Sequence, residues 1–263
     1  MSRERWRPPW PVVTVAAFAI LFFVLPLVGL LRQVRWGHLA SDLTSTAAVS
    51  ALRLSLVCST AAMAASVLFG IPLAWVLARM RLRAKPIFRA LVLLPMVLPP
   101  VVGGVALLAA FSRRGLVGSR LYDWFGVQLT FSTFGAVMAE TFVAMPFFVI
   151  TVEAALRSLD PRVEEAASAL GASRWMVFRR ITLPSIRPAV IAGGVLAWAR
   201  ALGEFGATIT FAGNIVGRTQ TLPLAVYLAL EARPELAIAL SLVMLVTSVA
   251  VIAALRDRWL QRP

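Results

Sequence analysis

Long apolar runs alternate with short polar segments along the whole chain. A helix needs about 20 mainly apolar residues to cross a hydrocarbon core of about 30 Å. Six stretches meet this length, and they span about 11–31, 47–77, 87–111, 131–156, 188–212 and 236–255. The pattern predicts an all-α polytopic membrane protein with six transmembrane helices.

Composition agrees with this prediction and narrows the chemistry. Of the 263 residues, 60% are hydrophobic, whereas water-soluble domains are about 45–50% apolar. The one cysteine, Cys58, lies inside an apolar run, and the one histidine, His38, lies between two runs. Disulfide frameworks, metal sites and nucleophilic catalysis need clusters of such residues. We therefore expect no catalytic or metal site, and we interpret 11–31 as a true span because no small-residue cleavage site follows it.

Basic residues set the expected orientation. If the N-terminus is cytoplasmic, 17 of the 26 Lys and Arg fall on the cytoplasmic side, 7 fall outside and 2 lie within spans. Cytoplasmic loops carry the excess of basic residues, so both termini, 1–10 and 256–263, are expected in the cytoplasm. The membrane is expected to be a prokaryotic inner membrane. The net charge of +14 is thereby explained by topology and membrane lipid, and it implies no nucleic acid partner.

The segment 160–184, between the fourth and fifth predicted spans, has the marks of two short helices. Asp160 followed by Pro161 is a strong helix start, since Asp caps free N–H groups and Pro fits the first turn. Gly171 accepts the left-handed conformation that ends a helix. The topology places this helical elbow on the cytoplasmic side.

The second elbow helix is expected over 174–181, capped by Ser173 and ended by Pro184. One interpretation of the elbow is an amphipathic helix lying on anionic lipid. Its first helix, however, is acidic and rich in alanine, which suits docking in a protein groove better than contact with headgroups.

The elbow resembles the EAA motif of ABC-importer permeases. The chain reads EAA at 165–167, G at 171, I at 181 and LP at 183–184, which matches the motif at every position. The likeness extends over about 45–255 and implies the type I ABC-importer (MetI-like) permease fold, with the span at 11–31 as an addition. It also implies that the elbow couples to an ATPase through Glu164, Glu165, Ala166, Ala167, Gly171, Leu183 and Pro184.

This resemblance implies a set of partners. A P-loop needs Gly-Lys-Ser/Thr, and the only lysine, Lys85, precedes Pro86, so ATP and Mg²⁺ would bind in two cytoplasmic P-loop ATPase subunits. This chain would hold no cofactor and be no enzyme. One elbow per chain implies a second copy of the chain. An extracytoplasmic oxyanion-binding protein would dock on the long outer segments 112–130 and 213–235, where SRLYDWFGVQL predicts a short surface helix.

Two stretches bear on the substrate. The segments ARALGEFGATITFAGN, at 199–214, and RTQTLPLAVYLALE, at 218–231, resemble the molybdate branch of these permeases. That resemblance implies molybdate import. The sulfate/thiosulfate branch is close and remains the alternative. A different class, a stand-alone ion-coupled secondary transporter, could use buried acids as proton carriers but leaves the elbow unexplained.

Four charged residues within the predicted spans are candidates for the translocation path, because charges are costly in a bilayer. They are Arg53, Glu140, Arg200 and Glu204. Arg200 and Glu204 are four residues apart, and such neighbours share a helix face. A neutral structural network, with Arg200 pairing Glu204 or Glu140, is the favoured interpretation. In the alternative, Arg53 or Arg200 faces the path and stabilises the dianion.

The third predicted span contains residues that disrupt a helix. These are Pro95, Pro99, Pro100, Gly103 and Gly104. Each proline removes a backbone hydrogen bond, and free carbonyls at membrane depth are tolerated where they are buried in protein or face a cavity. This span is expected to line the path or the dimer centre, unless the irregularity only fits neighbouring helices.

Overall fold

The computed structural model describes residues 9–80 and 83–259, with side chains described up to residue 253. Within these residues every regular element is a helix, and no strand occurs. The elements are α1 (Trp10–Gln33), α2 (Leu39–Leu43), α3 (Thr46–Arg79), α4 (Lys85–Val97), α5 (Pro100–Phe111), α6 (Gly118–Phe125), α7 (Thr133–Ser158), α8 (Pro161–Ala169), α9 (Arg174–Val177), the π-helix η1 (Phe178–Thr182), α10 (Leu183–Ser185), α11 (Arg187–Leu202), α12 (Gly206–Ala212), α13 (Leu222–Ala232) and α14 (Pro234–Trp259).

Four helices among the described residues are long and apolar enough to cross a membrane. They are α1, α3, α7 and the segment Pro234–Ala253 of α14. A fifth arises if Arg174–Ser185 and Arg187–Leu202, bent by 68° to each other, are counted as one span. The all-helical polytopic class is therefore confirmed, while the structure contains fewer unbroken spans than the six predicted.

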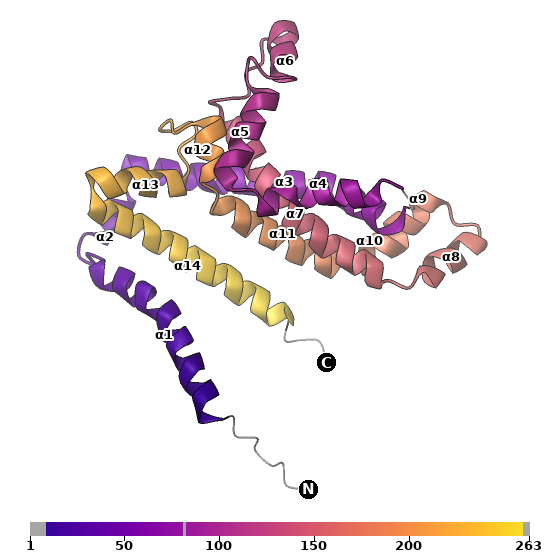
Figure 1. Cartoon of the computed structure of the whole chain (residues 1–263), viewed down its shortest axis with the longest axis horizontal. Helices are drawn as coiled ribbons and strands as arrows, with labels where there is room; N and C mark the ends of the chain where they lie inside the picture. Colours follow the sequence, from indigo (N-terminus) through magenta and orange to yellow (C-terminus); the bar gives the residue numbers. More distant parts are fainter. Residues whose placement is uncertain (1–8, 81–82, 260–263) are drawn as a thin grey trace.

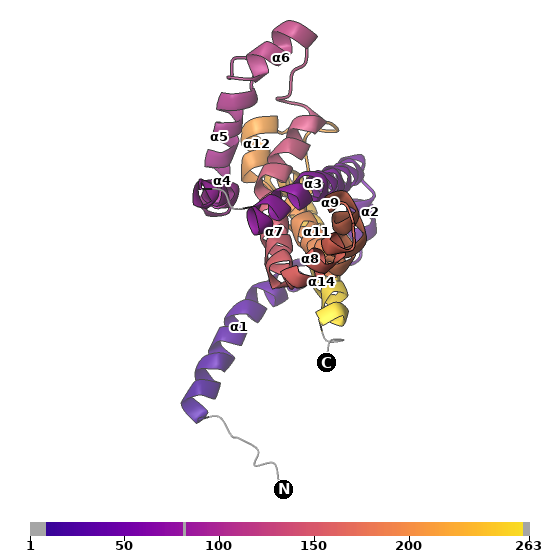
Figure 2. The ribbon, with the colours of Figure 1, turned by 90° about the vertical axis from the view of Figure 1, so that its right-hand side faces the viewer.

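Two predicted spans are broken rather than continuous. The stretch 87–111 divides at Leu98 and Pro99 into α4 and α5, and α5 runs across the direction of α4 in both views (Figures 1 and 2). Proline lacks an N–H, and the residue before it avoids the helical conformation, so consecutive prolines end α4. The stretch 188–212 divides at 203–205 into α11 and α12. Hydropathy detects the apolar length but not the change of direction.

The bundle centres on α3, α7 and α11, which pack against one another (Figure 1). The helices α13 and α14 lie along this trio, and α5 pairs with α12 to one side. The helix α1 has no buried residue, and it leaves the bundle on the side opposite to α6 in both views (Figures 1 and 2). The short helix predicted within 119–129 is present as α6, and its place on the outer side of the membrane stays a prediction.

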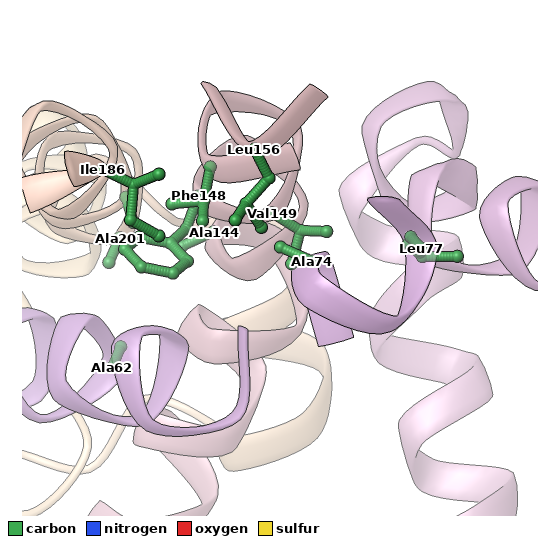
Figure 3. Packing of buried hydrophobic residues seen from close by; sticks show 11 residues of the cluster. Ala62, Ala74, Leu77, Ala144, Phe148, Val149, Leu156, Ile186 and Ala201 are labelled. Atoms are coloured by element: carbon green, nitrogen blue, oxygen red, sulfur yellow. The ribbon is translucent and has the colours of Figure 1, made fainter. Parts of the chain in front are cut away.

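The core of the trio is built around one aromatic ring. Phe148 of α7 is fully buried and lies among Ala62 and Ala74 of α3 and Ala201 of α11 (Figure 3). Two glycines make room for it. A Cβ built on Gly70 of α3 would lie 2.5 Å from the Phe148 ring, and one on Gly193 of α11 would lie 3.2 Å from it. The ring therefore occupies space that only glycine leaves open.

Small side chains line the buried face of α3 over nearly its whole length. Its buried residues are Ala48, Ala51, Ser55, Cys58, Ser59, Ala62, Ser66, Gly70, Ala74 and Leu77. They recur every three or four residues, so they share one face of the helix. Small residues let membrane helices approach closely and gain van der Waals contact. This face explains how one 34-residue helix packs against both α7 and α11.

We expect Gly70→Ala to lower the apparent melting temperature of the purified protein, because its methyl group would overlap the Phe148 ring. Overpacking of this kind costs about 1–3 kcal/mol. The matched control is Gly29→Ala in α1, where a Cβ meets nothing within 4 Å and alanine favours the helix. Equal melting temperatures for the two variants would contradict the packing described for Phe148.

Candidate functional site

The first elbow helix begins and ends as the sequence predicts. The Asp160 carboxylate accepts a hydrogen bond of 3.0 Å from the Arg162 N–H at the start of α8. At the other end, Gly171 has a φ of +86°, and the Ala172 N–H donates to the Ala167 carbonyl at 3.1 Å. This is the left-handed termination that glycine favours. The predicted caps of this helix are confirmed.

The second elbow helix is longer than predicted. Ser173 caps it by accepting a hydrogen bond of 3.2 Å from the Met176 N–H, as expected. It does not end at Pro184, however, because α9, η1 and α10 continue without a break to Ser185. The Leu183 N–H bonds the Phe178 carbonyl across a wider π-turn. Such a turn accommodates the following proline, which has no N–H to donate.

Glu164 fixes the elbow to the rest of the protein. Its Oε1 lies 3.2 Å from Nη2 of Arg79, the last residue of α3, and accepts a hydrogen bond of 2.7 Å from the Thr182 hydroxyl. Thr182 is buried, and Glu164 and Arg79 are mostly covered. One carboxylate thus joins three segments, which are the first elbow helix, the second elbow helix and the end of α3.

Aromatic rings form a second attachment. Phe178 stacks on Trp175 at a centroid distance of 5.7 Å and meets Trp75 of α3 edge to face at 6.2 Å. Pairs with these geometries contribute about 0.5–1.5 kcal/mol beyond burial. The second elbow helix is therefore held against α3 at the ring of Trp75 as well as at Arg79.

The remaining motif residues lie on the outer surface of the elbow. Glu165, Ala166, Gly171 and Pro184 are exposed, whereas Ala167 and Leu183 are half-buried. Large apolar side chains are also exposed here, namely Val163, Leu170, Trp175 and Met176, and Leu170 is 90% exposed. Several large exposed apolar side chains on one short segment favour a protein interaction site. Glu164 differs from its motif neighbours because its carboxylate faces inward.

The break between α11 and α12 is held by Glu204. Its Oε2 lies 2.7 Å from Nη1 of Arg200, and its Oε1 accepts a hydrogen bond of 2.8 Å from the Ala207 N–H in the first turn of α12. The side chain of Glu204 is 1% exposed. Arg200 and Glu204 are thus brought together as predicted, although the helix has already ended between them at Leu202.

Glu140 and Arg53 lie apart from this pair. Glu140 is buried in α7, and its Oε2 has no hydrogen-bond partner among the described residues. The sequence allowed Arg200 to pair with either acid, and the structure pairs it with Glu204. Arg53 is exposed in the second turn of α3 and lines a cavity of about 320 Å³ with Ser50 and Gly217.

The irregular third span forms a tight helix contact. Pro99 and Pro100 are exposed and Pro95 is half-buried. Gly103 and Gly104 are buried, and a Cβ on Gly104 would lie 2.6 Å from the Thr210 Cβ of α12. The prolines therefore turn the chain, and the glycines let α5 approach α12.

Sequence reasoning missed Glu153. It lies inside the predicted span 131–156, yet only four charged residues were singled out in the spans. The structure buries its side chain to 2% exposure between Arg89 of α4, at 3.5 Å, and Arg157, at 2.8 Å. The signal was present, because an arginine follows the acid by four residues and Arg89 lies within another predicted span.

Comparisons with known proteins agree with this architecture. The family model described as "Binding-protein-dependent transport system inner membrane component" matches residues 66–262. The chain is 45% identical over 251 residues to the "Molybdenum transport system permease protein ModB" of Mycobacterium tuberculosis, covering 95% of this chain and 94% of that protein. It is 37% identical over 221 residues to the "Sulfate transport system permease protein CysT" of Escherichia coli, covering 83% and 79%.

A solved structure shares the fold. The chain aligns with one from a bacterial ABC transporter involved in the import of the acidic polysaccharide alginate, with a TM-score of 0.73 and 21% identity, covering 96% of each chain. The family match spans well over half of the chain, and the similarity to the molybdenum permease of Mycobacterium tuberculosis covers 95% of it. The chain belongs to the family of binding-protein-dependent transport system inner membrane components, the permease subunits of ABC transporters.

Proposed function

We propose that this chain is the permease subunit through which an ATP-driven importer moves molybdate from an extracytoplasmic binding protein into the cytoplasm. The observation that carries the substrate is the 45% identity to a molybdenum permease over 95% of the chain. Identity to the sulfate permease is lower, at 37% over 83% of the chain, so sulfate is the second candidate. Both substrates are tetrahedral oxyanions.

ATP hydrolysis takes place in two partner ATPase subunits, and the elbow at 160–184 is where they dock. Three observations support this position. Glu165 and Ala166 are exposed on α8, the elbow also exposes large apolar side chains, and Glu164 ties the elbow to α3 through Arg79. An exposed surface on a braced helix pair can receive a partner and pass its movement into the bundle.

The chain crosses the membrane six times with both termini in the cytoplasm. The permease domain covers 45–255, and α1 is an added span. The broken pairs α4–α5 and α11–α12 each act as one crossing. The asymmetry of basic residues supports this orientation, because 17 of the 26 Lys and Arg lie in the two termini, in or beside the elbow, and in or beside the α3–α4 connection.

A second copy of the chain and the binding protein complete the importer. Each chain has one elbow, so two copies present two elbows to a pair of ATPases. The binding protein docks on the outer segments, where α6 exposes Trp124 and Phe125. A cavity of about 550 Å³ opens there, lined by Arg113, Arg114 and Asp123 among others. Exposed aromatic and charged side chains together are common in protein interfaces.

The path runs beside the helix breaks at the centre of the dimer. Pro95, Pro99, Pro100, Gly103 and Gly104 shape one break, and Arg200 with Glu204 holds the other. Glu140 and Arg53 are further candidates on α7 and α3. The neutral Arg200–Glu204 pair acts mainly as a structural brace of its break, because Glu204 also binds the start of α12.

The substrate is tested by ATP hydrolysis in the complete importer. The permease is reconstituted in proteoliposomes with its own ATPase and binding protein. We expect hydrolysis to rise when the binding protein carries molybdate and to stay at the level of the anion-free binding protein with sulfate. Stimulation by sulfate and not by molybdate would contradict the proposed substrate and favour the sulfate alternative.

The brace at Glu164 is tested by the ratio of molybdate imported to ATP hydrolysed. Glu164→Gln and Arg79→Gln each weaken a charged, mostly covered contact worth on the order of 1 kcal/mol. We expect the ratio to fall roughly fivefold in each variant, while the ATPase stays bound.

The control for this test exchanges the charges, with Arg79→Glu and Glu164→Arg in one protein. Recovery of the ratio in that protein would show that the contact itself matters. An unchanged ratio in both single variants would mean that the elbow does not depend on this brace.

The role of Arg200 is tested by comparing stability with uptake. Arg200→Gln leaves the buried Glu204 carboxylate without its counter-ion, which costs about 3 kcal/mol, so we expect a lower apparent melting temperature. Adding Glu204→Gln removes the unpaired charge and should restore much of the lost melting temperature. If Arg200→Gln keeps its stability but loses uptake, Arg200 serves the path and is not a brace.

A further inference from the structure

A basic cavity lies where α4 begins and α7 ends. Its volume is about 640 Å³. The cations that line it are Arg83, Lys85, Arg89 and Arg157. No acidic residue is among the lining residues, all of which belong to the described part of the chain. The sequence drew attention to this region only through its count of basic residues, and the elbow and the helix breaks do not involve it.

One buried acid fixes the positions of two of the arginines that line this cavity. Glu153 pairs with Arg89 and Arg157 at 3.5 and 2.8 Å, and its own side chain is 2% exposed. The two arginine side chains are 43% and 45% exposed, so they remain accessible to a ligand. A planar guanidinium presents five N–H donors and binds phosphate well.

The charges of the cavity do not balance. Glu153 neutralises one of four cations, and Arg83 and Lys85 add two more donors from the connection before α4 and from its first turn. The excess positive charge therefore favours an anionic ligand in this cavity. Phosphate fits best, since it accepts several hydrogen bonds from arginine and lysine at once.

An apolar surface continues from the cavity along α4. Ala90 and Leu93 form part of its wall. On the same helix Ile87, Leu91 and Leu94 are 64%, 59% and 46% exposed. Their spacing of four and three residues places them on one face of the helix. A free oxyanion has no apolar part that could contact such a surface. A lipid, in contrast, can place its headgroup among the cations and an acyl chain along the helix.

We infer that this cavity binds the phosphate headgroup of an anionic phospholipid of the cytoplasmic leaflet, with an acyl chain lying along α4. The choice of the cytoplasmic leaflet rests on the orientation of the chain proposed above. Basic pockets between membrane helices on the cytoplasmic side are suited to such headgroups. Because Glu153 joins α4 to α7 behind the pocket, a bound lipid also stabilises the contact between these two helices.

The test measures lipid binding to the purified full-length permease without ATPase or binding protein. Phosphatidylglycerol or phosphatidylcholine is added in detergent, and bound lipids are counted by native mass spectrometry. We expect phosphatidylglycerol to be preferred. The double variant Arg83→Gln with Lys85→Gln should weaken its binding about thirtyfold, since each basic residue contributes about one factor of five or six.

Two controls match this variant. Arg83→Lys with Lys85→Arg keeps the charge and should keep the lipid. Arg180→Gln with Arg187→Gln removes the same charge outside the cavity and should bind phosphatidylglycerol as the unaltered protein does. Equal losses in both neutralised variants would overturn the site, because charge alone would then explain the effect.

Competition separates the lipid from a free anion. Millimolar molybdate or phosphate should not displace phosphatidylglycerol, and displacement would overturn the lipid assignment in favour of a free oxyanion. If the cavity variant retains lipid but no longer binds the ATPase, the cations serve a protein partner, and the inference is wrong. None of the lipid measurements requires transport. They therefore test the lipid site even if the proposed import of molybdate is wrong.

Discussion

Close contact between helix backbones is the constraint on which the rest of this structure depends. In a bilayer, lipid tails are as apolar as the helix faces, so burial drives helix association far less than it does in water. Helix association then depends on how closely the helix surfaces fit together. The small-residue face of α3 supplies this fit on one side, and Gly70 and Gly193 admit the Phe148 ring on the other. The same device recurs where Gly104 lets α5 approach α12.

Once the helices are close, two of the buried acids lie where a helix is interrupted or ends, whereas Glu140 lies within α7. Glu204 lies at the break before α12 and bonds a free backbone N–H as well as Arg200. Glu153 lies near the end of α7 and holds two arginines. Polar groups in a membrane protein are hydrogen-bonded internally or face water. These two acids accept hydrogen bonds or pair with arginines at places where the regular helical hydrogen bonds are missing or come to an end.

Much of the fold was predictable because apolar length and helix caps are local properties. Sequence patterns predicted the helical class and the caps at Asp160, Gly171 and Ser173. They allowed Arg200 to pair with Glu204 or Glu140, and the structure pairs it with Glu204. Direction was not predictable. The directions taken after α4 and α11 involve contacts with distant helices. The π-turn before Pro184 begins at Phe178, whose ring contacts Trp75 of α3, and sequence spacing does not show that contact.

The candidate site shows the same division. Spacing identified the elbow, but it could not show that Glu164 faces inward while Glu165 faces outward, because adjacent residues on one helix differ by about 100° in direction. The partner of Glu164 is Arg79, which is 85 positions away in the sequence. A contact of that range has no local pattern. The contact of Glu153 with Arg89 is also long-range, although Arg157, four residues after Glu153, was a local signal that was missed.

The two attachments of the elbow to α3 have a mechanical consequence. Trp75 and Arg79 are four residues apart, so they lie about 6 Å apart along the helix axis, and each holds the second elbow helix or the residue bound to it. A single attachment would act as a hinge and let the elbow swivel. Two attachments one turn apart resist rotation, so a push on the elbow becomes a torque on the end of α3.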